Sequence, residues 1–264
     1  MRSFEFHRPQ SVADAVALLK GNDSAKLLAG GQSLLPVMKL DLAQPSDLVT
    51  LAGIPGLREI RAAGDNLVIG ALVTHDEVAS SPEVRRRIPA LAGLAAGIGD
   101  AQVRNRGTIG GSLAHADPAA DYPAAVLALG ATIVTDRRRI AADDYFTGLF
   151  QTALAADEII TAVSFPVPER AAYAKFPSPA SKYAVVGVMV AKTAGGVRVA
   201  VTGAGSKAFR VPALESALAA SFKAEAINPG AVAAADLRSD GDASAEYRAH
   251  LVTVMAKRAV QACS

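Results

Sequence analysis

The sequence has few of the residues that build covalent cross-links or metal sites. Its 264 residues include a single cysteine, Cys263, no tryptophan and four histidines. One cysteine excludes an internal disulfide, and it excludes a thiolate-ligated zinc or iron–sulfur cluster held by this chain alone. We therefore expect a protein of a reducing compartment, located in the cytoplasm.

Long apolar runs and a strong net charge are also missing. No stretch of about 18 to 20 apolar residues occurs, and the start of the chain, MRSFEFHRPQ, has no apolar signal segment, so we expect no transmembrane segment. Lysine and arginine number 27 against 25 for aspartate and glutamate, a net charge of +2 that does not indicate a nucleic-acid partner. The 51% hydrophobic content is enough for a sizeable core.

The first two thirds of the chain alternate between helix and strand patterns. Ser11 and Gly21 are typical of the start and end of a helix, and Pro89 should divide the helix that begins at Pro82. Strands are expected near residues 25–30, 46–53, 57–64, 66–73, 131–135 and 157–166, and a further helix should end at Gly130.

A change of pattern lies near residues 166–180, where four prolines interrupt the chain. Beyond it we expect a β-hairpin that turns at Gly195 and Gly196, a helix from about Pro212 and a final helix over residues 245–263. Strands followed by helices predict a small α+β module packed on the first domain.

Two glycine pairs are the most unusual stretches: AGGQS at residues 29–33 and GTIGGS at residues 107–112. Paired glycines let the backbone approach a ligand closely and let consecutive N–H groups converge on an anion, with Ser33, Thr108 and Ser112 as further donors. One diphosphate held between the two motifs is one interpretation, and two ordinary tight turns is the other. The residues alone leave both open.

A third glycine pattern, VTGAGSKA, fits G-x-G-x-x-A at Gly203, Gly205 and Ala208. Pro212 interrupts the long helix that a dinucleotide site requires, and no apolar second strand with a ribose-binding acid follows. We therefore favour a plain loop at the end of a strand.

Several charged residues have both a functional and a structural interpretation. His115, Asp117 and Asp121 could bind a metal or transfer protons, but no second histidine or cysteine group completes a metal site, and one carboxylate could cap the helix that starts near Tyr122. Lys175 could balance negative charge on a ligand or could be solvated. Arg137 to Arg139 favour an exposed turn over a docking surface. No residue is assigned a catalytic or metal-binding role.

Four segments together resemble one protein family. AGGQSLLPVMKL, QVRNRGTIGGSLAHADPAADYPA, AYAKFPSPASKYAVVGV and VTGAG are similar, in this order, to the FAD-binding medium subunits of molybdenum hydroxylases, and within them most to those of aerobic carbon monoxide dehydrogenases. The resemblance covers essentially the whole chain.

The resemblance implies an α+β fold. It consists of an FAD-binding domain of the vanillyl-alcohol oxidase type with two α/β subdomains, followed by a small C-terminal α+β domain. We place the first domain at residues 1–170, divided near 55–60, and the second at residues 171–264.

The resemblance also implies which residues contact FAD. The two glycine motifs would hold its diphosphate, Asp117 and Asp121 would contact the ribityl chain and the ring, Lys175 would lie near the flavin, and Ile98 and Ile160 would form apolar walls. Gln32 stands where many relatives have histidine, and Lys182 stands before Tyr183 where several have aspartate. The resulting set is Ala29, Gly30, Gly31, Gln32, Ser33, Leu34, Ile98, Thr108, Ile109, Gly110, Gly111, Ser112, Asp117, Asp121, Ile160, Lys175 and Tyr183.

The function that follows from the resemblance is electron transfer. The [2Fe-2S] clusters would lie in a small partner subunit and the molybdenum cofactor in a large one, assembled as a dimer of heterotrimers, and electrons would pass through the clusters to FAD and on to an external acceptor. Peripheral attachment to the inner face of the membrane through this complex is a further expectation.

Other functions fit the same residues. They are a stand-alone flavin oxidase or reductase, a medium subunit of a xanthine, aldehyde or N-heterocycle dehydrogenase, and a scaffold that has lost flavin.

Overall fold

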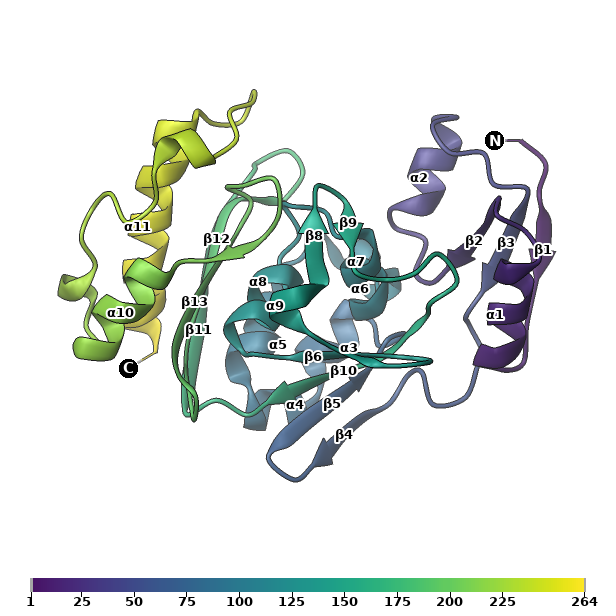
Figure 1. Cartoon of the computed structure of the whole chain (residues 1–264), viewed down its shortest axis with the longest axis horizontal. Helices are drawn as coiled ribbons and strands as arrows, with labels where there is room; N and C mark the ends of the chain where they lie inside the picture. Colours follow the sequence, from purple (N-terminus) through teal and green to yellow (C-terminus); the bar gives the residue numbers. More distant parts are fainter. Residues whose placement is uncertain (1, 264) are drawn as a thin grey trace.

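The computed structural model describes residues 2–263 and contains three main sheets arranged in a row (Figure 1). The N-terminal sheet lies at one end, a five-stranded sheet covered by helices lies in the middle, and a third sheet separates the middle from the two C-terminal helices. The α+β class expected from the sequence is confirmed.

The first sheet is parallel, with strand order β1-β3-β2. Its elements are β1 (Glu5–His7), α1 (Val12–Lys20), β2 (Ala25–Leu28), α2 (Leu34–Lys39) and β3 (Asp47–Thr50). Helix α1 begins as expected, because the Ser11 side chain accepts a hydrogen bond from the Asp14 N–H. The first glycine motif is the connection between β2 and α2.

The second sheet is antiparallel, with order β4-β5-β10-β6-β7. Its strands are β4 (Ile60–Ala63), β5 (Asn66–Gly70), β6 (Thr132–Thr135), β7 (Arg139–Ala141) and β10 (Ile160–Pro166). The helices of this part are α3 (His75–Ser80), α4 (Pro82–Arg87), α5 (Pro89–Ala96), α6 (Ala101–Arg106), α7 (Ile109–His115), α8 (Tyr122–Ala128) and α9 (Ala142–Tyr145), and a small hairpin pairs β8 (Phe146–Gly148) with β9 (Gln151–Thr152). Pro89 divides α4 from α5, as the sequence predicts.

The third sheet is antiparallel, with strands in sequence order: β11 (Arg170–Pro177), β12 (Ala184–Thr193), β13 (Gly196–Thr202) and β14 (Phe209–Arg210). The helical segments that follow are α10 (Pro212–Ala220), two 3-10 turns (Ala224–Ala226 and Ala234–Asp236) and α11 (Ala245–Ala262). The predicted hairpin turn is confirmed by the pairing of Thr193 with Gly196.

The third sheet is buried on both faces, and this joins the C-terminal part to the middle of the molecule. Along β12, Val188 and Val190 pack into a core with α10 and α11, whereas Met189 and Ala191 pack into the core of the second sheet and its helices. Alternate residues of a strand point to opposite faces, so one strand contributes to both cores. Among the described residues, no helix combines the length and the apolarity needed to span a membrane.

Candidate functional site

A cavity of about 960 Å³ opens between the three sheets. Its walls come from β2 and the first glycine motif, from α7 and the second glycine motif, from residues 147–160, and from residues 181–183 before β12. This volume is at the upper end of the usual range for small-molecule sites, about 300 to 1,000 Å³. The cavity is therefore large enough for an extended ligand.

The first glycine motif presents unpaired backbone donors to this cavity. No acceptor among the described residues takes the N–H groups of residues 30–34, and the next N–H, that of Leu35, donates to Gly31 O. Gly31 has a φ of +75°, a conformation that glycine adopts without strain. Consecutive free N–H groups on a turn before a helix form a site for an anion.

The two glycine motifs lie in direct contact. A side chain on Gly30 would overlap the carbonyl of Arg106 and approach Gly107 Cα to 2.9 Å. The absence of a Cβ at Gly30 thus lets the first motif pack against the residue that precedes the second motif.

The second glycine motif differs from the open loop that the sequence pattern indicated. Residues 109–115 form α7, and the N–H groups of Ile109, Gly110 and Gly111 donate to Val73 O, Ala71 O and Thr108 Oγ1. These donors are therefore not available for a ligand. Gly110 is needed for packing, because a Cβ there would lie 2.6 Å from Ala71 Cβ.

Gly111 faces the first glycine motif instead. A Cβ on Gly111 would lie 3.6 Å from Ala29 Cβ and 2.8 Å from Thr108 Oγ1, whereas Ser112 on the next position lines the cavity. The two motifs thus contribute differently: the first supplies free N–H groups, and the second supplies a hydroxyl and a bare glycine surface.

Asp121, Lys175 and Tyr173 form a buried cluster beside the cavity. Tyr173 Oη donates to Asp121 Oδ1 at 2.6 Å, and Lys175 Nζ lies 3.0 Å from the same oxygen. Asp121 is 4% exposed and lines the cavity. Burial raises the pKa of the Asp121 carboxyl, and the charge of Lys175 and the hydrogen bond from Tyr173 act against that rise.

This cluster corrects two structural interpretations from the sequence. The Asp121 side chain makes no capping bond to α8, because its oxygens face Tyr173 and Lys175. Lys175 is not a solvated lysine: its side chain is 11% exposed, and its Nζ also donates to the carbonyls of Gly97 and Lys182.

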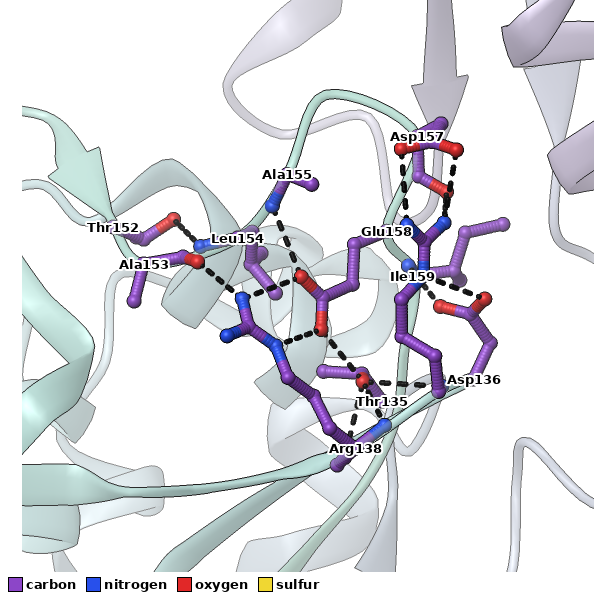
Figure 2. Close-up of polar contacts among 11 residues, drawn as sticks. Thr135, Asp136, Arg138, Thr152, Ala153, Leu154, Ala155, Asp157, Glu158 and Ile159 are labelled. Atoms are coloured by element: carbon purple, nitrogen blue, oxygen red, sulfur yellow. Dashed lines mark hydrogen bonds and ion pairs between the residues drawn. The ribbon is translucent and has the colours of Figure 1, made fainter.

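The cavity wall formed by residues 152–160 is fixed by a charged network (Figure 2). The Glu158 side chain is fully buried and accepts hydrogen bonds from Arg138, from the Thr135 hydroxyl and from the Ala155 N–H. The bonds from Arg138 outweigh the effect of burial, and together with the other two donors they lower the pKa of Glu158 to about 2.

Arg137 and Arg138 lie on the exposed turn that the sequence indicated, between β6 and β7. Arg137 pairs with Asp157 at 3.0 Å, and Arg138 pairs with Glu158 at 2.8 Å. Asp157 also lies 3.9 Å from Lys20 Nζ at the end of α1. These pairs connect the wall to the second sheet and to α1.

Most of the site residues expected from the sequence surround this cavity. All members of the set line it except Ile109, which is fully buried, and Lys175, which reaches it only through Asp121. Ile98 and Ile160 lie on its walls, and Tyr183 is 43% exposed at the third sheet.

Other residues of the cavity carried no sequence signal that distinguished them. Phe150 lines it from the β8–β9 hairpin, and its ring packs against His115 at a centroid distance of 5.1 Å. His75 also lines it and packs against Gly107: a Cβ on Gly107 would lie 2.5 Å from His75 Nε2. Burial and the charge of Arg104 lower the pKa of His75 to about 4, so this imidazole is neutral at physiological pH.

The G-x-G-x-x-A pattern is a loop at the end of a strand, as favoured from the sequence. It follows β13, which pairs antiparallel with β12 and not in the parallel arrangement of a dinucleotide-binding unit. Thr202 and Gly203 contact the segment before α8 instead.

Comparison with known proteins identifies the family. A family model described as the FAD binding domain in molybdopterin dehydrogenase matches residues 2–168. The nicotine 6-hydroxylase medium subunit of Paenarthrobacter nicotinovorans and the carbon monoxide dehydrogenase medium chain of Hydrogenophaga pseudoflava are each 40% identical to this chain, over 98% of its length and 96% of theirs.

Solved structures agree in fold over the same length. A carbon monoxide dehydrogenase from Hydrogenophaga pseudoflava superposes with a TM-score of 0.93 at 40% identity, covering 99% of this chain and 97% of the other. Quinoline 2-oxidoreductase from Pseudomonas putida 86 gives 0.90 at 30% identity, covering 99% and 97%. The chain therefore belongs to the FAD-binding medium subunits of the molybdenum hydroxylases, and its cofactor is FAD.

Proposed function

We propose that this chain is an electron-transfer subunit that holds FAD in the cavity between the three sheets. FAD is a two-electron carrier that can exchange single electrons with iron–sulfur clusters, and the protein supplies its binding, orientation and electrostatic environment. The observation that carries the proposal is the run of free N–H groups at residues 30–34, inside a cavity lined by both glycine motifs.

The residues of the cavity fit this cofactor. Five successive N–H donors and the hydroxyl of Ser112 suit a diphosphate, the anionic centre of an extended molecule. Toward the first sheet the cavity is apolar, with Leu19, Leu27 and Leu51, which suits an adenine. Toward the third sheet it carries Asp117, Asp121 and Tyr183, which offer acceptors for the ribityl chain and the ring N–H.

We assign the cofactor contacts on this basis. Residues 29–34 and 108–112 surround the diphosphate. Ile109 is buried and supports this motif from the core, and Lys175 influences the flavin through its ion pair with Asp121. The assignment extends to Ile98 and Ile160 as apolar walls. Asp121 is the one carboxylate among these residues, and Tyr173 and Lys175 already donate to its oxygens, which supports electron transfer over chemistry of its own.

Partner subunits follow from the same reasoning. With one cysteine, the chain cannot bind an iron–sulfur cluster alone, so we propose a small [2Fe-2S] subunit as the electron donor and a large subunit that carries the molybdenum cofactor. We further propose assembly as a dimer of such heterotrimers, which works in the cytoplasm or at the inner membrane face.

The substrate belongs to the proposed large subunit. Carbon monoxide is the expectation from the overall resemblance of the sequence. A medium subunit of a nicotine hydroxylase and one of a carbon monoxide dehydrogenase are equally similar to this chain, so an N-heterocycle is the second candidate.

We also propose a division of the chain into residues 1–170, with subdomains that meet near 55–60, and residues 171–264. The first sheet ends at Thr50, the second starts at Ile60, and the third starts at Arg170, which supports these limits.

The experiment that tests the function compares the chain alone with the chain co-expressed with its neighbouring subunits. We expect substrate to reduce the bound FAD, measured by loss of flavin absorbance, only in the assembled complex. A chain that oxidises substrate by itself would support a stand-alone oxidase or reductase, and a chain that never binds FAD would refute the proposal.

A further inference from the structure

The third sheet holds the segment before α8 by its backbone. The carbonyl oxygens of Pro118, Ala119 and Ala120 all accept hydrogen bonds from this sheet: the Gly203 N–H donates to Pro118 O at 2.7 Å, and the Ala184 N–H donates to Ala119 O at 3.2 Å. Thr202 Oγ1 lies 2.6 Å from Ala120 O and 2.9 Å from Pro118 O and shares its single proton between them. Thr202 is fully buried.

The same sheet holds the side chain that ends this segment. Tyr173 and Lys175 on β11 both donate to the Asp121 carboxylate. Gly187, opposite Lys175 on β12, makes this possible, because a Cβ there would overlap the Tyr173 hydroxyl and lie 2.9 Å from Thr202 Cγ2. Glycine inside a strand weakens it, so its presence here is explained by the space that Tyr173 occupies.

A buried arginine fixes the donors from the opposite side. Arg248 on α11 is 2% exposed, and its Nη1 donates to Gly203 O at 2.8 Å and to Val185 O at 2.5 Å. Its Nη2 donates to Asp240 at 2.6 Å. Gly203 has a φ of +82°, and a Cβ there would lie 2.6 Å from Val185 O. The strand ends that contact Pro118 and Ala120 are therefore themselves rigidly placed.

We propose that Thr202 and Tyr173 are positioning residues for the flavin: they hold the Pro118–Asp121 segment so that Asp121 faces the cavity at a fixed place. The proposal rests on the proposed FAD site and extends it to a sheet outside the residues that the FAD-domain model matches, 2–168. Neither residue lines the cavity, so each acts through the segment and not by contact.

The test uses the full chain, purified together with the subunits with which it assembles. Thr202→Val and Tyr173→Phe remove one hydroxyl each at nearly constant volume. Thr202→Ser keeps the hydroxyl and serves as the rescue, and Thr253→Val on α11 is a matched control, because Thr253 is buried but makes no hydrogen bond to the Pro118–Asp121 segment. Asp121→Asn tests the FAD site itself.

We expect the dissociation constant for FAD to rise about fivefold in Thr202→Val and about tenfold in Tyr173→Phe, from the loss of a neutral and of a charge-assisted hydrogen bond. The midpoint potential of the FAD that remains bound should move in both variants. Thr202→Ser and Thr253→Val should match the wild type in both measurements. A change in potential is the decisive result, because a loss of stability alone would lower FAD content without it.

Two results overturn the proposal and can be told apart. If Asp121→Asn alters the affinity and the potential but Thr202→Val and Tyr173→Phe do not, the positioning role is wrong and the FAD site stands. If Asp121→Asn also leaves both unchanged, the proposed flavin placement is wrong as well. Should Thr202→Val fail to fold, Tyr173→Phe decides the question by itself.

Discussion

The glycines of the two motifs have different structural roles, although both motifs contain a Gly-Gly pair. Gly30 and Gly110 are bare because protein atoms occupy the space of a side chain, whereas Gly111 faces Ala29 across the gap between the motifs. A substitution at Gly111 therefore fills the proposed diphosphate site more directly than one at Gly110, which would disturb the packing against Ala71.

We predict that Gly111→Val abolishes FAD retention while the chain still folds. The β-branched side chain would enter the gap between the motifs and also displace the Thr108 side chain. FAD per chain after gel filtration measures the effect. Gly93→Ala is the matched control, since Gly93 lies exposed on α5 with no atom near a new Cβ.

The control should bind FAD normally and gain up to about 1 kcal/mol in unfolding free energy, because alanine favours the helix. Normal FAD content in Gly111→Val would contradict the assignment of the second motif.

Residue types pointed to the glycine motifs and to the carboxylates, but not to which atoms are free. The N–H groups of residues 109–111 are paired within the protein. Thr108 caps its own helix, whereas Ala71 and Val73 come from a separate segment whose position no local pattern reveals. Likewise, Lys175 and Asp121 are 54 positions apart, so their pairing could not be read from either segment.

At the level of elements, the wall formed by residues 152–160 depends on one buried carboxylate. In Figure 2 the Glu158 carboxylate accepts hydrogen bonds from Arg138, from the Thr135 hydroxyl and from the Ala155 N–H. Because the pKa of Glu158 is about 2 in the folded chain, against an ordinary value of 4.5, its ionised form stabilises the fold. This stabilisation is complete above about pH 4.5 and is lost as the pH falls toward 2.

We predict that Glu158→Gln lowers the unfolding free energy at pH 7 by about 1 to 3 kcal/mol, from loss of the charge-assisted hydrogen bonds. The difference from the wild type should shrink between pH 4.5 and pH 2, and urea unfolding at a series of pH values measures it. Glu169→Gln is the control, because the Glu169 side chain is 52% exposed and its surface pair with Lys192 contributes about 0 to 1 kcal/mol.

An unchanged difference across that pH range would show that Glu158 is not the linked group.

Several helix and strand ends were predictable from the sequence. Pro89, Gly130, Gly195 and Ser11 mark ends that depend on local backbone chemistry, and the structure places element boundaries at or beside each of them. The exposed turn at Arg137 was predicted, but its acidic partners Asp157 and Glu158 were not, because they come from a segment 20 residues away.

At the level of the whole molecule, one ligand would connect all three sheets. A ligand that binds only the folded chain stabilises it by about 2.7 kcal/mol at a concentration 100 times its dissociation constant. For a chain of this size that corresponds to roughly 5 to 10 °C in Tm.

We therefore predict that saturating FAD raises the Tm of the FAD-free chain by roughly 5 to 10 °C, measured by calorimetry. Riboflavin, which lacks the diphosphate, should raise it far less. Gly30→Ala should remove the FAD effect, because its side chain would force the two glycine motifs apart. An equal shift with riboflavin would contradict the role of the free N–H groups.

The position of Lys175 and Tyr173 on β11 has a consequence for shortening the chain. The FAD-domain model ends at residue 168, which invites expression of that part alone. Such a fragment would keep the Asp121 carboxylate and lose both of its donors, and it would expose the side of α8 that packs on β12 and β13. The FAD-binding domain expressed alone is therefore not expected to work as an independent flavin-binding module.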